Sequence, residues 1–421
     1  MIQSETTAFL TWLVEQGLAG ADAPVLLDGF VQRCTDAGLH LSRAVVFIDT
    51  LHPIFEGGGA RWTDDGNAVE AFTYGRSSGE GSGAAMWQRS PLYALIISGR
   101  RELRLNFARD GTGGFPVLEE MRADGHTDYC AFIDRFGTVD IIGEMDCVYS
   151  HWYSRKPDGF AADDLATLRQ IVPALALAVK AAALARSALT LADVYLGRDA
   201  ARRVLSGRIS RGVPDRITAV LWFSDLQGYT RISDTADPGE IIPLLNDYAE
   251  AAIAAIHGDG GDVLKLIGDG VLAIFTDPDP ARAGRAALRA EHAMRARVAA
   301  LNVRRVAAGQ PVTSIYAGLH VGEVLYGNIG SQDRLDFTVV GPAVNEVSRI
   351  ASMCGSAERN LLVSAELRAA LREPERDALV AVGRFALRGL NRADFLYTLD
   401  PAIMEGGEAA DAYAQILDRA E

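Results

Sequence analysis

A glycine-rich turn between two apolar runs constrains the fold of the C-terminal half more than any other feature. The runs lie within DVLKLIGDGVLAIF (262–275), and Gly268-Asp269-Gly270 separates them. Because glycine adopts the backbone conformations that a tight turn needs, this segment predicts a β-hairpin. A hairpin pairs its strands antiparallel, so we expect the sheet around it to be largely antiparallel.

Strand and helix patterns alternate on both sides of this hairpin. Apolar runs at 216–225 and 334–341 predict strands, and SIYAGLHVGEVLYGNIG (314–330) predicts a second hairpin. The helical patterns cover 240–260, 281–305 and 343–353. The last part of the chain is therefore expected to be an α+β domain, with a mixed, largely antiparallel sheet and flanking helices.

The first part of the chain predicts a smaller α/β domain. Two helical patterns, Thr6–Gln16 and Val25–Ala37, precede a series of short β-rich runs. These runs are AVVFI (44–48), AVEAFTYG (68–75), ELRLNF (102–107), DYCAFIDRF (128–136) and SHWYSR (150–155). A further helix is expected at Ala84–Ser98, and a long final helix follows the turn at Asp158-Gly159.

The long final helix carries an apolar stripe along one side. Its members are Leu165, Leu168, Val172, Leu175 and Val179. Such a stripe is typical either of packing against its own domain or of a seam between two copies, and the sequence leaves both open. After a break, the helical pattern continues through LADVYLGRDAARRVLSGRI (191–209), which predicts a helical linker.

The length and net charge of the chain indicate how many domains it has and which partners it does not favour. With 421 residues and 49% hydrophobic residues, the chain is long enough for two folded domains. Its formal net charge of −14 opposes a general affinity for nucleic acid or for an anionic membrane. The N-terminus has no signal-peptide pattern, and Pro173, Lys180 and Arg186 interrupt the most apolar segment, so no membrane span is expected. Four scattered cysteines fit reduced thiols, and we expect a soluble, cytoplasmic protein.

Two aspartates lie where a metal site would need them. Asp225 ends an apolar strand and precedes LQGYT, and Asp269 lies between two glycines at the tip of the predicted hairpin. Carboxylates without an adjacent base suit a hard divalent cation such as Mg²⁺, and two of them can hold two ions about 4 Å apart. Taken singly, Asp225 could be a helix cap and Asp269 a turn residue. In the N-terminal part, His126 near Cys130 and Cys147 near His151 are expected to be buried structural residues rather than a metal or chromophore site.

Four motifs in a fixed order resemble the catalytic domain of the class III nucleotide cyclases. They are FSDLQGYT (223–230), KLIGDGVLAIF (265–275), GLHVGEVLYGNIG (318–330) and FTVVGPAVNEVSRI (337–350). They fall within Asp215–Leu399, and the region 215–400 is predicted to be an adenylate cyclase catalytic domain. The N-terminal sheet with its long closing helix and the RKPDGF approach to it resemble a GAF-type sensor, which we assign to residues 1–185. Residues 186–214 would form the signalling linker and 401–421 a C-terminal tail.

The resemblance implies a role for individual residues. Asp225 and Asp269 would bind two divalent cations, Mg²⁺ or Mn²⁺. The backbone of Leu226, Gln227, Gly228, Tyr229 and Thr230 would cradle phosphate oxygens. Lys265 and Thr338 would read the adenine base, and Asn345 and Arg349 would position the ribose and stabilise charge on the α-phosphoryl group.

The chain departs from the family pattern at two positions. Arg388 stands where the family often has a lysine for the triphosphate, and arginine presents a wider fork of donors. The purine-reading position is Thr338 rather than an aspartate, which fits a bacterial-type subclass and leaves some use of GTP open. Asp336 is expected on the same strand face as Thr338, but the spacing to Gly341 selects Thr338.

In this family one active site takes residues from two chains. The metal aspartates come from one subunit, and the base-reading and Asn/Arg residues come from its partner. Because this chain contains both sets, the resemblance implies a homodimer that acts on ATP and responds to an unknown signal at its N-terminal domain. A guanylate cyclase and a catalytically silent nucleotide-binding regulator are the alternatives.

Overall fold

The computed structural model describes residues 3–66, 68–75, 82–137, 143, 145–210, 212, 214–387 and 393–400. Contacts divide the chain into two compact units, residues 1–191 and 192–421. Each unit has its own sheet and core. Arg388 and the predicted tail, 401–421, lie outside the described residues.

A six-stranded antiparallel sheet forms the centre of the N-terminal unit. Its strand order is β3-β2-β1-β6-β5-β4. The strands are β1 (Arg43–Asp49), β2 (Gly57–Thr63), β3 (Val69–Tyr74), β4 (Glu102–Asn106), β5 (Asp128–Arg135) and β6 (Cys147–Ser154). Strand β2 was not predicted, because its first half is three glycines, which are depleted in strands.

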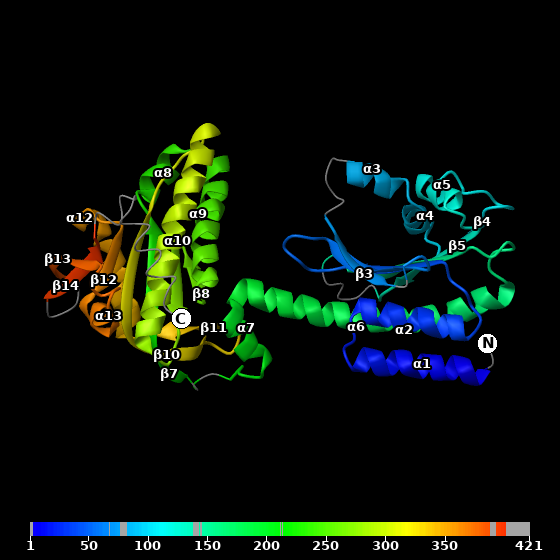
Figure 1. The fold of residues 1–421 in the computed structure, drawn as a ribbon, viewed down its shortest axis with the longest axis horizontal. Coiled ribbons are helices and arrows are strands. Elements are labelled where there is room, and N and C mark those ends of the chain that lie inside the picture. Colours follow the sequence, from blue (N-terminus) through cyan, green and yellow to red (C-terminus); the bar gives the residue numbers. More distant parts are fainter. Residues whose placement is uncertain are drawn as a thin grey trace. The chain divides into compact units, whose positions relative to one another are not determined.

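Helices cover both faces of this sheet (Figure 1). They are α1 (Gln3–Leu18), α2 (Ala23–Asp36), α3 (Ser82–Gln88), α4 (Pro91–Ser98), α5 (Pro116–Ala123) and α6 (Ala162–Leu196). Helices α1, α2 and α6 bury Leu13, Phe30 and Leu168 in one core with Trp152 of β6. Helices α4 and α5 pack on the opposite face, where Tyr149 of β6 is buried.

The single helix predicted at Ala84–Ser98 is two helices in the structure. Pro91 starts α4, and the Ser90 hydroxyl accepts a hydrogen bond from the Tyr93 backbone N–H at 3.1 Å, which caps the new helix. Proline lacks the backbone donor that a continuous helix would use there. Of the residues expected to be buried, His126, Cys130 and Cys147 are buried, whereas His151 is only partly buried. Both histidines form a hydrogen bond. His126 Nδ1 lies 2.8 Å from the Ser42 hydroxyl, and His151 Nδ1 lies 3.1 Å from the Tyr129 hydroxyl.

Helix α6 uses its apolar stripe inside its own unit. The five predicted stripe residues are all buried in the core with α1 and α2, so packing against its own domain is confirmed for them. Among the described residues, α6 is one helix with the length and apolarity of a membrane span, and 44% of its most apolar window is buried. Gly197, with φ of 84°, ends α6, and α7 (Arg198–Leu205) follows.

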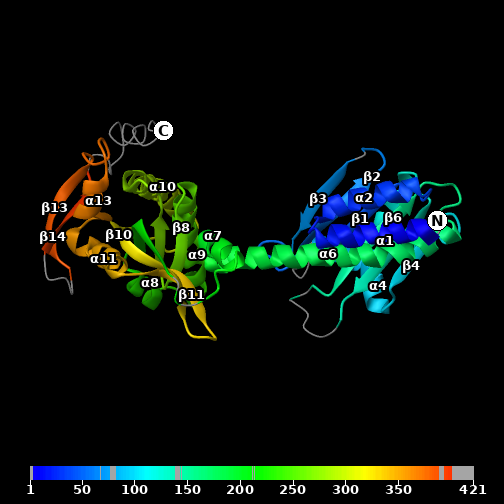
Figure 2. The same ribbon diagram turned by 90° about the horizontal axis from the view of Figure 1, so that it is seen from below.

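An eight-stranded, largely antiparallel sheet forms the centre of the C-terminal unit (Figure 2). Its order is β13-β14-β12-β10-β7-β9-β8, and β11 pairs with β10. The strands are β7 (Asp215–Leu226), β8 (Asp262–Ile267), β9 (Gly270–Phe275), β10 (Ile315–Gly330), β11 (Leu335–Val340), β12 (Leu361–Ser364), β13 (Leu379–Ala386) and β14 (Ala393–Leu399). The predicted β8–β9 hairpin and the α+β fold class are confirmed.

The predicted hairpin at 314–330 is wrong. The segment is one long strand, β10, which pairs with β7 along most of its length and then forms a hairpin with β11. Its glycines serve close packing rather than turning. A Cβ on Gly318 would lie 2.7 Å from the Ala351 backbone nitrogen, and one on Gly322 would lie 2.6 Å from the Ala343 Cβ. Both neighbours belong to a helix that lies against β10.

Helices also cover both faces of this sheet. They are α8 (Tyr229–Thr235), α9 (Pro238–Gly258), α10 (Pro280–Ala307), α11 (Pro342–Ser352), α12 (Cys354–Ala357) and α13 (Ala365–Ala370). Helices α9 and α10 pack on the face that contains Trp222, whereas α7 and α11 pack on the face that contains Leu221. The alternation of β7 side chains between two apolar layers explains its nearly continuous hydrophobic run.

Candidate catalytic site

Two aspartates meet at one edge of the C-terminal sheet. Asp225 is the penultimate residue of strand β7, and Asp269 lies in the turn between β8 and β9. Strand β9 pairs with β7, so the turn is held beside the end of β7. The backbone N–H of Leu226 lies 3.2 Å from Asp225 Oδ1 and 3.2 Å from Asp269 Oδ2. The two carboxylates therefore share one backbone donor.

This arrangement places two acids in a partly desolvated position. Burial raises the pKa of Asp225 to about 7, and the hydrogen bond and negative charge of Asp269 act in the same direction. Leu245 and Tyr248 of α9 help to line the space behind the pair. Two carboxylates this close repel each other when both are ionised, and a divalent cation between them would remove that repulsion.

The loop after Asp225 is fixed by backbone contacts. The Gln227 N–H donates to the Ser314 carbonyl at 2.9 Å, and the Thr313 hydroxyl donates to the Gln227 carbonyl at 2.6 Å. Gly228 has φ of 66°, a left-handed conformation that a residue with a side chain rarely adopts, and it caps helix α8. The predicted phosphate loop continues into the first turn of α8 with Tyr229 and Thr230.

The predicted base-reading residues come from two strands that the fold brings together. Lys265 is exposed on β8, and Thr338 lies on β11, where Phe337 and Val339 on either side of it are buried. Lys265 Nζ forms an ion pair with Asp336 Oδ2, also on β11. The expectation that Asp336 and Thr338 share a strand face agrees with their matching partial burial. The ion pair itself was not predicted. The alternation of residues along β11 places Asp336 on the same side as Thr338, so it was a signal that Asp336 could also meet Lys265.

Asn345 and Arg349 lie one turn apart on helix α11. Asn345 is exposed and Arg349 is partly buried, and between them Val347 anchors the helix in the core. Gly318 allows the α11 backbone to approach β10 closely, as described above. The fold thus presents the two polar side chains from a helix that is held firmly against the sheet.

The strand pairing places Asp225 and Thr338 opposite different ends of β10. Asp225 pairs with Tyr316 near the start of β10, whereas Thr338 pairs with Gly327 near its end. The metal pair and the base-reading threonine therefore lie toward opposite ends of the same strand within one chain.

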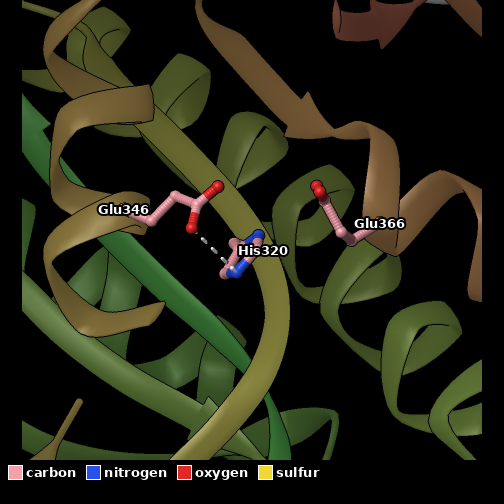
Figure 3. A group of neighbouring side chains, drawn as sticks. All are labelled: His320, Glu346 and Glu366. Carbon is pink, nitrogen blue, oxygen red and sulfur yellow. Dashed lines mark ion pairs between the residues drawn. The ribbon is translucent and has the colours of Figure 1, made fainter. Parts of the chain in front are cut away.

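A histidine contact ties α11 to the sheet (Figure 3). His320 of β10 is buried, and its Nε2 lies 3.7 Å from Glu346 Oε2 on α11, next in sequence to Asn345. Its Nδ1 lies 2.9 Å from the Ser364 hydroxyl, which also accepts the Leu367 N–H at the start of α13. Ligand atoms of His320, Glu346 and Glu366 all lie within 4.8 Å of one another, so this group could hold a cation. The contacts of His320 with Glu346 and Ser364 also link β10 to α11 and to the start of α13, which is a structural role.

Comparison with known proteins places this unit in a family. Residues 214–400 match the model of the adenylate and guanylate cyclase catalytic domain. An adenylate cyclase of Anabaena cylindrica is 32% identical over 176 residues, which cover 42% of this chain and 35% of that protein. Adenylate cyclase 1 of Rhizobium meliloti is 28% identical over 171 residues, which cover 40% and 26%.

A solved structure is similar to part of the chain. The adenylyl cyclase CyaB from P. aeruginosa is 27% identical, with a TM-score of 0.41, and the match covers 45% of this chain and 96% of that one. The chain spans about a third or less of the length of these two curated relatives. The family match contains all four sequence motifs and both aspartates, so residues 214–400 belong to the class III adenylate and guanylate cyclase catalytic domains.

Proposed function

We propose that the protein is an adenylate cyclase that converts ATP to 3′,5′-cyclic AMP and pyrophosphate. The observation that carries the proposal is the pair Asp225 and Asp269, whose carboxylates share the Leu226 N–H at one edge of the cyclase sheet. In this reaction the ribose 3′-oxygen bonds to the α-phosphorus and loses its proton. The bond from the α-phosphorus to the bridging oxygen breaks, and pyrophosphate leaves.

The aspartate pair fits divalent cations. Both donors are carboxylate oxygens, which Mg²⁺ and Mn²⁺ prefer. The pKa of Asp225 is raised by burial first and by the neighbouring Asp269 carboxylate second, and a bound cation would offset both effects. Bound cations would supply Lewis-acid stabilisation of the triphosphate and of the attacking oxygen. Asp225 and Asp269 would hold them, and the Leu226 N–H would keep the two carboxylates oriented.

Other residues would bind and orient the nucleotide. The backbone from Leu226 to Thr230 would donate to phosphate oxygens, because Gly228 leaves the loop open on its outer side. Lys265 would donate to adenine N1, and Thr338 would accept from the exocyclic amine. Asn345 would hold the ribose, and the Arg349 guanidinium would stabilise charge on the α-phosphoryl group. Arg388 would contribute to triphosphate binding.

We propose a homodimer with shared sites. The register along β10 supports it, because Asp225 and Thr338 are held toward opposite ends of that strand in one chain. Two chains related by a two-fold axis can bring the metal end of one to the base-reading end of the other, which forms two equivalent sites. The N-terminal unit, residues 1–185 in our assignment, would regulate them as a GAF-like sensor through the linker at 186–214.

A guanylate cyclase is the main alternative. A lysine and a threonine suit the hydrogen-bond pattern of adenine, so ATP is favoured. A catalytically silent regulator is disfavoured because every predicted metal and transition-state residue is present.

Product analysis tests this function. Purified protein is incubated with ATP or with GTP, in the presence of Mg²⁺ or Mn²⁺, and the cyclic product is separated by chromatography. We expect cyclic AMP to form faster than cyclic GMP. Faster formation of cyclic GMP would favour the guanylate cyclase, and the absence of both products would favour the silent regulator.

A further inference from the structure

The N-terminal unit contains a large cavity that the cyclase function does not use. Its lining includes residues of α3, α4 and α5, and its volume is about 1030 Å³. These helices lie on one face of the sheet (Figure 1). Small-molecule sites commonly measure roughly 300–1,000 Å³, so the space suits a ligand of that class. All of its lining residues belong to this one unit.

Aromatic rings form much of the cavity wall. The Phe47 ring stacks on Tyr149 with centroids 4.9 Å apart and meets the edge of Tyr74 at 5.6 Å. Trp87 of α3 meets Tyr149 edge to face at 5.9 Å, and Phe72 lies 6.2 Å from Phe47. Ring faces carry partial negative charge, so a group of rings around one space attracts a cation.

The charged side chains of the lining are mostly acidic. Asp49, Glu56, Glu120 and Asp146 supply four carboxylates, and Arg89 supplies the single guanidinium among the lining residues. The Tyr74 hydroxyl donates to Asp49 Oδ1 at 2.6 Å, which fixes that carboxylate beside the rings. The negative charge of these carboxylates near the rings adds to the attraction for a cation and repels an anion.

His151 does not offset this acidity. It lines the cavity from β6, with its Nδ1 bonded to the Tyr129 hydroxyl. Burial, with the charge of Arg43 as a smaller cause, lowers the pKa of His151 to about 3, so the ring is neutral near pH 7. The neutral ring adds one more flat surface to the wall.

We propose that this cavity binds a small organic cation, an aromatic or alkyl ammonium, in the space bounded by the rings of Phe47, Trp87 and Tyr149 and by the carboxylates of Asp49 and Asp146. The ammonium group would lie beside the carboxylates and the aromatic wall, and the apolar body would fill the rest of the cavity. Anionic ligands, including the cyclic nucleotide product, are excluded by the same carboxylates. The site concerns only the N-terminal unit and holds whether or not the other unit is active.

Titration calorimetry on the full chain tests the proposal. The probes are benzyltrimethylammonium and 2-phenylethylammonium as cations, and phenylacetate and cyclic AMP as anions. We expect both cations to bind at least about tenfold more tightly than either anion. Benzyltrimethylammonium should also quench tryptophan fluorescence, and Trp87→Phe should abolish the quenching while it preserves most of the affinity.

Matched variants locate the site. Asp49→Asn/Asp146→Asn should weaken benzyltrimethylammonium binding by about tenfold or more, since both carboxylates lose their charge. Glu70→Gln is the control, because Glu70 is exposed on β3, pairs with Arg61 and is absent from the cavity lining. Thermal melting identifies any variant that does not fold, and Phe72→Leu then serves as a second test of the wall.

Three outcomes would overturn the proposal. The first is that neither cation binds at several millimolar, and the second is that an anion binds as tightly as the cations. The third is that folded Asp49→Asn/Asp146→Asn binds benzyltrimethylammonium as well as Glu70→Gln does.

Discussion

Lys265 on β8 forms an ion pair with Asp336 on β11, two residues before Thr338 on the same strand face. The side chains of the pair are 45% and 44% exposed. An exposed ion pair contributes only about 0–1 kcal/mol, so under the proposed function a nucleotide base would displace Asp336 from Lys265 at small cost. Until a base arrives, Asp336 holds the lysine over β11.

Asp336→Asn should therefore weaken substrate binding with little effect on the chemical step. Without its partner the Lys265 side chain gains freedom, which must be lost again on binding. We expect KM for ATP to rise by about two- to fivefold with kcat nearly unchanged, as for a residue that acts on ground and transition state alike. Asp333→Asn, an exposed acid in the same hairpin, is the control in steady-state kinetics. An unchanged KM would show that Asp336 does not orient Lys265.

Exchange of the base-reading residues should redirect the enzyme toward GTP. Lys265→Glu with Thr338→Cys gives the donor and acceptor pattern expected for guanine. The new carboxylate would lie beside Asp336, so the variant also carries Asp336→Asn to remove that repulsion. We expect the ratio of kcat/KM for ATP over GTP to fall by at least about tenfold, because mismatched buried polar groups discriminate strongly. If the ratio stays at the wild-type value, these positions do not read the base.

Acid should destabilise the N-terminal unit through His151. Its pKa is lowered to about 3 in the folded unit, against about 6.5 in the unfolded chain. Below about pH 6.5 the unfolded chain therefore binds a proton that the folded unit does not, and stability falls by up to about 1.4 kcal/mol per pH unit from this group. Urea unfolding at pH 7.5 and 5.5 measures the loss.

The matched variant for this prediction is His151→Gln, whose amide can still form a hydrogen bond with the Tyr129 hydroxyl. Its stability should change less between the two pH values than that of the wild type. The remaining change would come from other groups such as His126, whose pKa burial also lowers. Equal losses in both proteins would contradict the assignment to His151.

Helices and strands were predicted correctly where the residue pattern of the segment itself matches the way the segment packs in the folded domain. The β8–β9 hairpin turns at Gly268, where φ of 64° needs glycine, and the pattern alone identified it. Strand β10 was misread because Gly318 and Gly322 look like turn residues, yet they serve close contact with α11, which only the packed structure reveals. Ser90-Pro91 indicates the start of a new helix, α4. The helical spacing of apolar residues on both sides nevertheless led to the prediction of a single helix.

The candidate site divides in the same way. Asp225 and Asp269 could be named from motifs, because each lies at the end of a strand that the pattern defines. Spacing selected Thr338 rather than Asp336 as the base-reading residue, but it did not predict the ion pair of Lys265 with Asp336, which depends on how β11 meets β8. The link from His320 to Glu346 depends on contacts between elements that are distant in sequence.

Complementation between two inactive variants should restore activity if sites are shared. Asp225→Asn/Asp269→Asn keeps Asn345 and Arg349, and Asn345→Ala/Arg349→Ala keeps both acids. In a mixed dimer one site carries every lesion and the other is intact. Random pairing makes about half of the dimers mixed, so coexpression should restore about one quarter of wild-type cyclic AMP formation. Formation of the mixed dimer is verified with two affinity tags. Verified mixed dimers that stay as inactive as the parents would show that each chain builds its own site.

The most direct test of the central claim is the dependence of cyclic AMP formation on the two acids and on divalent metal. Rates are measured with Mg²⁺, with Mn²⁺ and after removal of metal by a chelator, for wild type, Asp225→Asn and Asp269→Asn. Asp234→Asn is the control, because Asp234 is an exposed acid on nearby α8. We expect either site variant to lose about a hundredfold or more of the activity while it remains folded. The control variant should keep full activity, and the chelator should abolish the activity of the wild type. Near-normal, metal-independent cyclic AMP formation by folded Asp225→Asn and Asp269→Asn would contradict the proposed role of the two acids.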